Sequence, residues 1–184
     1  MSGPVVRRIR ADEWERVRDL RLESLADSDA AVAFLETLES SRELDPDFWR
    51  ERASNGAKSE VVAQLVAEDD GVWVGSVAVL VRRRGDTDHH GVVSTEDRAD
   101  VVGVYVRPTH RGKGVLDALL AHAANWTRAA GFDTLTLDVH RDNPHARAAY
   151  ARCGFVETGR TFTGVIGPEI ECALDLGGEG GASH

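Results

Sequence analysis

VVGVYVRPTHRGKGVL, residues 101–116, is the stretch that decides the fold of this chain. The run Val101–Val106 is rich in β-branched residues and predicts a strand, which Pro108 ends. Apolar residues then recur with helical spacing from Val115, so Arg111–Gly114 lie at a helix N-terminus. Unpaired backbone N–H groups and the helix dipole attract anions there, and glycines let a phosphate group approach the backbone. The stretch therefore predicts a strand that leads into a phosphate-binding turn.

This turn matches neither of two common phosphate motifs. In a P-loop the lysine is followed by Ser or Thr, which holds magnesium, whereas Lys113 is followed by Gly114. A dinucleotide fingerprint needs a glycine where this chain has Asp117. The remaining interpretation is a pyrophosphate held without a metal, by backbone N–H groups and by the charges of Arg111 and Lys113.

A second informative block is TLTLDVHRDNPHARAAYARCGFVET, residues 134–158. Apolar and polar residues alternate over residues 135–139, as in a half-buried strand. Asp142 or Asn143 can cap the helix that follows, and Gly154 ends it. One face of this helix carries Ala146, Ala149, Tyr150 and Cys153.

Together the two blocks resemble the GNAT superfamily of acyl-CoA-dependent N-acetyltransferases. The superfamily signature is Arg or Gln, two residues, Gly, one residue, then Gly or Ala; Arg111 and Gly114 match it, and Leu116 departs from it. The resemblance covers about Val101–Thr158 with specific motifs and, more loosely, the chain up to Leu176. The matching positions of the second block are Asn143, Ala146, Tyr150, Gly154 and Phe155.

The resemblance implies an α/β (mixed α+β) fold. Its sheet would be mixed, with six or seven strands splayed between the fourth and fifth, and about four helices would flank it. The length of 184 residues fits one domain. We expect this domain to span residues 1–176 and the glycine-rich tail Gly177–His184 to be disordered.

Periodicity predicts further elements before residue 100. They are a strand at Val5–Ile9, a helix at Asp12–Leu25 that Asp12 can cap, a helix from Asp45-Pro46 to about Ala53, and strands Val61–Glu68 and Val72–Arg82 joined by Asp69-Asp70-Gly71. The polar segment Arg83–Arg98 predicts a long loop, in which His89 and His90 lack further metal ligands at suitable spacing. The variable loops Ala26–Asp45 and Gly159–Glu169 would select the acceptor.

The composition of the chain indicates which kinds of partner it can bind. The net charge of −9 disfavours nucleic acid and fits a cationic amine. No apolar run approaches membrane-spanning length, and the start lacks the apolar core of a signal peptide, so we expect a cytoplasmic protein without a membrane partner. Cys153 and Cys172 are too few for a disulfide framework. A homodimer is compatible with the sequence.

The resemblance implies direct attack of a primary amine, on a small molecule or a peptide, on the thioester of acetyl-CoA. The amine must lose a proton first, because a lysine-like amine has a pKa near about 10.4. The developing oxyanion needs hydrogen-bond donors, and the departing thiolate needs a proton. Neither cysteine lies in a Cys/His pattern that would favour a covalent acyl-enzyme.

The resemblance also implies roles for individual residues. Main-chain groups of Val104, Tyr105 and Val106 would contact the pantetheine arm, and an N–H near Tyr105 or Val106 would face the thioester oxygen. Asn143 would hydrogen-bond the cofactor arm, and Tyr150 would be the general acid at the sulfur. The diphosphate would lie against Arg111, Gly112, Lys113, Gly114, Val115 and Leu116.

Several of these residues have a structural alternative. Tyr150 could be a core aromatic, and Asn143 could be only a helix cap. For the general base, Asp100 is the carboxylate nearest the start of the fourth strand, although it could simply end the charged loop. Glu23 and His140 are other candidates.

Asp138 alternates to the face opposite Leu137 and Val139, so we expect it to contact solvent or a helix rather than to act as a catalyst. Because the base is undecided and Leu116 departs from the signature, an alternative function is a catalytically silent acyl-CoA-binding regulatory or interaction module.

Overall fold

The computed structural model describes residues 3–27, 36–87, 93–164 and 167–177. These residues form seven strands: β1 Val5–Arg8, β2 Val62–Asp69, β3 Val72–Arg82, β4 Arg98–Val106, β5 Thr134–His140, β6 Val156–Gly164 and β7 Gly167–Asp175. They also form five α-helices: α1 Trp14–Ala26, α2 Leu38–Arg42, α3 Pro46–Lys58, α4 Val115–Ala129 and α5 Pro144–Arg152. Short 3-10 turns cover Ala11–Glu13 and Pro108–His110.

The strands form one mixed sheet in the order β1-β2-β3-β4-β5-β7-β6. All neighbouring strands are antiparallel except β4 and β5, which are parallel. β4 and β5 pair only at Asp100–Thr136 and Val101–Leu137, and beyond these pairs the two strands separate. The predicted mixed sheet and its splay between the fourth and fifth strands are confirmed.

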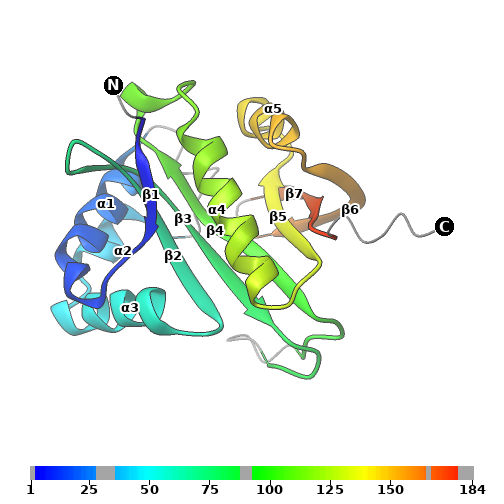
Figure 1. The fold of residues 1–184 in the computed structure, drawn as a ribbon, viewed down its shortest axis with the longest axis horizontal. Coiled ribbons are helices and arrows are strands. Elements are labelled where there is room, and N and C mark those ends of the chain that lie inside the picture. The colour runs from blue at the N-terminus through cyan, green and yellow to red at the C-terminus, as the bar shows by residue number, and fades with distance from the viewer. Residues whose placement is uncertain (1–2, 28–35, 88–92, 165–166, 178–184) are drawn as a thin grey trace.

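Hydrophobic cores lie on both faces of the sheet. On one face, Leu119 of α4 packs in a cluster with Val101 of β4 and Leu137 of β5. On the other face, a second cluster joins Val17 of α1 and Trp49 of α3 to β2 and β3. Figure 1 shows α4 lying across one face and α1–α3 grouped at the β1–β3 end. The β5 side chains that alternate away from α4 therefore lie outside both cores.

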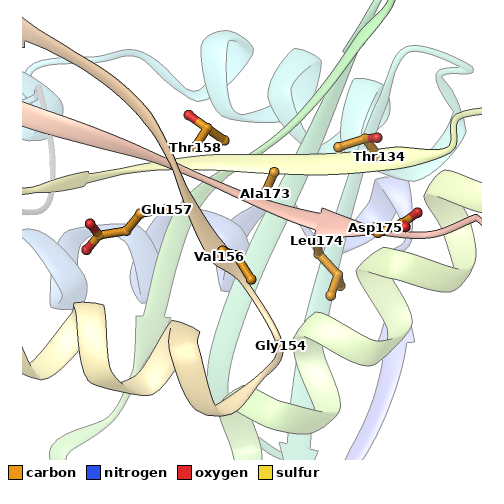
Figure 2. Close-up of a pocket in the computed structure, with 8 residues that line it drawn as sticks. All are labelled: Thr134, Gly154, Val156, Glu157, Thr158, Ala173, Leu174 and Asp175. Carbon is orange, nitrogen blue, oxygen red and sulfur yellow. The ribbon is translucent and has the colours of Figure 1, made fainter.

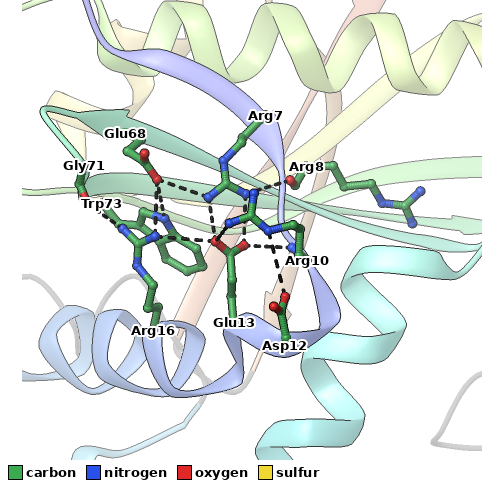
Figure 3. Close-up of polar contacts among 9 residues, drawn as sticks. All are labelled: Arg7, Arg8, Arg10, Asp12, Glu13, Arg16, Glu68, Gly71 and Trp73. Atoms are coloured by element: carbon green, nitrogen blue, oxygen red, sulfur yellow. Dashed lines mark hydrogen bonds and ion pairs between the residues drawn. The ribbon is translucent and has the colours of Figure 1, made fainter.

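A buried carboxylate joins the N-terminal elements (Figure 3). Glu13 accepts hydrogen bonds from both terminal nitrogens of Arg7, at 2.9 and 2.7 Å, and from the backbone N–H of Arg10 at 2.8 Å. Burial alone would raise the pKa of Glu13, but these hydrogen bonds lower it below its ordinary value. Asp12 does not cap α1 as the sequence predicted, because it lies in the preceding 3-10 turn; Glu13 is at the N-cap position and makes no side-chain cap hydrogen bond.

The predicted hairpin around Asp69-Asp70-Gly71 is confirmed, since β2 and β3 pair antiparallel across this turn. α3 begins as predicted, with the Asp45 carboxylate accepting the N–H of Phe48 at 3.1 Å. It is longer than predicted and continues past Ala53 to Lys58.

The segment Gly159–Glu169 is not the variable loop expected from the sequence, because β6 and β7 occupy most of it. β6 is an edge strand whose side chains are exposed or half-buried. It therefore lacks the alternation of apolar residues from which a strand is predicted. Residues 178–184 of the predicted tail, like His89 and His90, lie outside the described residues.

Candidate active site

The glycine turn predicted before α4 is present. Gly112 and Gly114 have positive φ angles of 71° and 80°, and Gly114 is the N-cap of α4. A Cβ atom at either glycine would meet no other atom within 4 Å, so the space over the turn is open. The first N–H groups of α4 can therefore be reached by an anion.

Arg111 joins this turn to two other elements. Its Nε donates to the carbonyl of Val106 at 2.9 Å, and its Nη2 donates to a carboxylate oxygen of Asp27 at 2.9 Å. Asp27 follows α1 directly and is far from Arg111 in sequence. The sequence offered no signal for this pair, because it depends on the packing of α1 beside the end of β4.

The backbone of β4 faces the splay at its end. The N–H of Arg107 donates to the carbonyl of Val74 on β3 at 2.8 Å. Because backbone groups alternate sides along a strand, the N–H of Val106 points away from β3, toward the gap between β4 and β5. Of the two amides expected to face a thioester oxygen, those near Tyr105 and Val106, this geometry favours Val106.

Glu23 and Arg107 form an ion pair at the same end of β4. Arg107 donates from Nε and Nη2 to the two oxygens of Glu23 at 2.6 and 2.7 Å, and the Tyr105 hydroxyl donates to Glu23 at 3.1 Å. The hydrogen bond from Arg107 lowers the pKa of Glu23, and burial with the nearby Glu23 charge raises that of Tyr105 to about 12. This arrangement makes Glu23 a structural partner of β4 and a poor candidate for the base.

At the start of α5, Asn143 is the cap residue. Its side-chain oxygen accepts the N–H of Ala146 at 3.1 Å, and the residue also lines the groove. His140 is buried, and its Nδ1 accepts the N–H of Asp142 at 3.1 Å. His140 thus supports the turn between β5 and α5.

Tyr150 is both a core residue and a groove residue. Its ring is buried in the α4-side core, with the Phe155 ring edge-on at 6.1 Å, and it also lines the groove described below. Burial, together with the nearby Cys153 and Cys172, raises the pKa of its hydroxyl above the ordinary value. The hydroxyl is therefore protonated at neutral pH, which a general acid requires.

Asp100 is buried and compensated by two arginines. Arg82 and Arg98 each donate to it at 2.8 Å, and the Thr136 hydroxyl donates to it as well. Arg98 also pairs with Glu171 at 2.8 Å. A carboxylate held by two guanidinium groups is typical of a structural ion-pair network. The catalytic role of Asp100 stays a prediction, and this geometry does not favour it.

One groove, of about 1830 Å³, passes these elements on both faces of the sheet. The predicted site residues that line it are Asp100, Val104, Tyr105, Val106, Arg111, Gly112, Gly114, Leu116, Asn143 and Tyr150. Lys113 is exposed beside it, and the Val115 side chain is buried in the core. Leu116 packs partly against the same core and also lines the groove.

Asp138 also lines this groove, although the sequence indicated only a contact with solvent or a helix. The alternation along β5 correctly placed it off the core face. That this face borders a groove depends on the separation of β4 from β5, for which the residues around Asp138 carry no signal.

A second, smaller pocket of about 460 Å³ lies at the opposite end of β5, against β6 and β7 (Figure 2). Its walls include Thr134, Val156, Leu174 and Asp175, and none of the predicted site residues. It is therefore separate from the groove.

The described residues offer little support for a cysteine nucleophile, a metal site or a membrane-spanning helix. The Cys153 thiol lies 3.1 Å from a carboxylate oxygen of Asp117, and burial with this contact raises its pKa to about 12, so it is a weak nucleophile. No group of three His, Cys, Asp or Glu side chains in the described ranges could hold a metal ion. In the same ranges, no helix has the length and apolar character needed to cross a membrane.

Comparison with known proteins relates this chain to one family. Residues 14–155 match the Acetyltransferase (GNAT) family. Aminoglycoside N(6')-acetyltransferase type 1 of Stenotrophomonas maltophilia is 38% identical over 106 residues, which are 56% of this chain and 65% of that protein. Streptothricin acetyltransferase of Streptomyces lavendulae is 40% identical over 84 residues, 44% of each chain. The chain thus spans less than two thirds of the length of these relatives.

Solved structures share the fold at low sequence identity. A GNAT acetyltransferase of Streptococcus pneumoniae has a TM-score of 0.73 and 18% identity, covering 95% of this chain and 99% of its own. yncA of Salmonella typhimurium, solved with acetyl-CoA, has a TM-score of 0.71 and 17% identity, covering 99% of both chains.

Proposed function

Because this chain belongs to the GNAT family of acetyltransferases, we propose that it transfers an acetyl group from acetyl-CoA to a primary amine by direct attack on the thioester. One observation carries the proposal. A single groove contains the open N-terminus of α4, the separated strands β4 and β5, and the Tyr150 side chain. In the proposed reaction, the N-terminus of α4 would bind the diphosphate, the separated strands would admit the thioester, and Tyr150 would serve the leaving thiolate.

In this proposal the diphosphate lies on the N–H groups from Gly112 to Leu116, with Arg111 and Lys113 supplying positive charge. The pantetheine arm follows β4 between Val104 and Val106, and the amide nitrogen of Asn143 donates to it. The Val106 N–H stabilises the oxyanion, and the Tyr150 hydroxyl donates a proton to the departing thiolate.

We further propose a cationic small-molecule amine as the acceptor. The relatives named above act on an aminoglycoside and on streptothricin, as their names state. Consistent with this class, seven carboxylates among the described residues line the groove, which are Asp27, Glu36, Glu51, Asp100, Asp117, Asp138 and Glu169; of these, Asp27, Glu36 and Asp100 also pair with arginines. Carboxylates in a groove attract and orient cations. A peptide N-terminus is the other acceptor that this chemistry allows.

The test begins with calorimetric titration of acetyl-CoA, with desulfo-CoA and ATP as controls. Saturable binding of acetyl-CoA but not of ATP is expected. Release of CoA thiol is then measured with an aminoglycoside, streptothricin, a polyamine and a peptide as acceptors. Binding without turnover on any amine would favour the acyl-CoA-binding regulatory module, and absence of binding would overturn both functions.

A further inference from the structure

Asp138 lies where β4 and β5 separate. Leu137 forms the last β4–β5 pair, with Val101, and Asp138 is the next residue of β5. The neighbouring side chains Leu137 and Val139 pack in the α4-side core. The Asp138 side chain alternates to the opposite face, where it lines the groove. A carboxylate there borders the gap through which a thioester bound along β4 would meet its acceptor.

The surroundings of Asp138 differ from those of Asp100. Asp100 is held by Arg82 and Arg98. Asp138 has no hydrogen bond or ion pair with any of the residues that the structure describes. Arg98 is its nearby cation, and that guanidinium already binds Asp100 and Glu171. Of the two carboxylates Asp100 and Asp138, Asp138 is therefore the one that is left to accept a proton.

The charged groups around Asp138 come from both neighbouring strands. They are Arg98 and Asp100 on β4, and Glu169 and Glu171 on β7. The Asp138 side chain is exposed where it lines the groove, yet partial desolvation by the residues around it raises its pKa to about 6; Arg98 opposes this rise, and the three carboxylates add to it. At neutral pH the group is mostly ionised, yet it is a stronger base than an ordinary aspartate.

We propose that Asp138 is the general base of the acetyl transfer, a role that rests on the proposed function. Its carboxylate takes one proton from the substrate ammonium and leaves a neutral amine. The amine nitrogen then bonds to the thioester carbon, and the carbon–sulfur bond breaks. Tyr150 protonates the thiolate and regains a proton from the nitrogen, so that an amide and free CoA thiol are formed. Asp138 finally releases its proton to solvent.

The main experiment compares Asp138→Asn with Asp133→Asn in the full chain. Asp133 is an exposed aspartate that precedes β5 at the end away from the splay, so it controls for the chemical change. With the amine that the wild type acetylates best, Asp138→Asn is expected to lower kcat by about a hundredfold or more, since general-base catalysis contributes about 10² to 10⁴. Acetyl-CoA affinity should stay unchanged in both variants, and Asp133→Asn should keep its turnover.

Two further readouts separate a base from a structural residue. The wild-type kcat/KM should fall below about pH 6 as Asp138 becomes protonated, and Asp138→Asn should lose this acid limb. Formate should partly restore turnover in Asp138→Ala, because it supplies the missing carboxylate. In addition, the side-chain carboxyl signals of ¹³C-labelled aspartate can be followed by NMR as the pH is varied. The signal that is missing in Asp138→Asn belongs to Asp138, and its titration midpoint should lie near pH 6.

The outcomes are distinguishable. Full turnover in Asp138→Asn, or an ordinary NMR midpoint near 4, would overturn the assignment while leaving the proposed function intact. If the wild type binds acetyl-CoA but acetylates no amine, the proposed function fails, and the assignment fails with it. Loss of acetyl-CoA binding in Asp138→Asn would instead assign Asp138 to the donor site and also overturn the proposal.

Discussion

The carboxylate of Asp27, just after α1, accepts a hydrogen bond at 2.9 Å from Nη2 of Arg111, in the turn before α4. Asp27 is almost fully buried, with 8% of its side chain exposed, whereas 43% of the Arg111 side chain is exposed. A negative charge therefore lies beside the turn that we propose for the diphosphate. The pair also connects α1, which lines part of the groove, to the turn before α4.

Replacing Asp27 by Asn is expected to tighten acetyl-CoA binding, because the variant removes a charge that repels the phosphates and competes for Arg111. The gain should be about two- to fivefold, since Arg111 is partly exposed and such pairs contribute about 0.2–1 kcal/mol. Calorimetry at low and high salt would measure it, with Asp19→Asn, an exposed site on α1, as the control. Weaker binding in Asp27→Asn would indicate that Asp27 instead orients Arg111 toward the ligand.

Gly114→Ala tests the open turn. Gly114 has a φ of 80°, so an alanine should cost about 1–2 kcal/mol of stability. Its Cβ would also enter the space over the first N–H groups of α4. Acetyl-CoA affinity should fall about tenfold or more, since a hydrogen bond to a charged group contributes about 1.5–3 kcal/mol.

The matched control for this variant is Gly85→Ala. Gly85 has a φ of 94°, equally open surroundings and no place in the groove. It should lose similar stability and keep its acetyl-CoA affinity. Equal loss of affinity in both variants would show that strain, and not the blocked turn, is responsible.

Tyr150→Phe tests the proposed acid. The ring and its contact with Phe155 are retained, so the melting temperature and acetyl-CoA affinity should change little. Thiol release should fall about a hundredfold, because the leaving thiolate loses its proton donor. An unchanged rate of thiol release would leave Tyr150 with a packing role only.

Glu13→Gln tests the N-terminal ion-pair cluster. The variant should lose roughly 2–4 kcal/mol at pH 7, because Arg7 is left without its buried anion. Since folding lowers the pKa of Glu13, its stabilising effect is full above the ordinary value of 4.5 and is lost as the pH falls below it. Urea unfolding of both proteins at pH 7 and at pH 3 would measure this.

The exposed Glu15→Gln on α1 is the control for the loss of charge. The difference between wild type and Glu13→Gln should shrink at pH 3. A difference that stays constant between the two pH values would argue against an ionised Glu13 as its source.

Much of the fold follows from local pattern. The strand that ends before Pro108, the glycine turn and a cap at Asp142 or Asn143 were predicted, since each depends on residues a few positions apart; the structure has Asn143 as the cap. β6 was missed because an exposed edge strand has no alternating apolar residues. The Asp12 cap was wrong because a 3-10 turn, Ala11–Glu13, precedes α1 and moves the start of the helix beyond Asp12.

The sequence by itself therefore determined the family, the order of the elements and the turn that offers backbone N–H groups to an anion. Only the tertiary structure decided which carboxylates are neutralised and which are left to act. Asp100 and Asp138 are similar in sequence terms, yet Arg82 and Arg98 bind the first, and the separation of β4 from β5 opens the second to the groove. The proton affinity of a carboxylate depends on charges and burial contributed by distant segments, and these meet only in the folded chain.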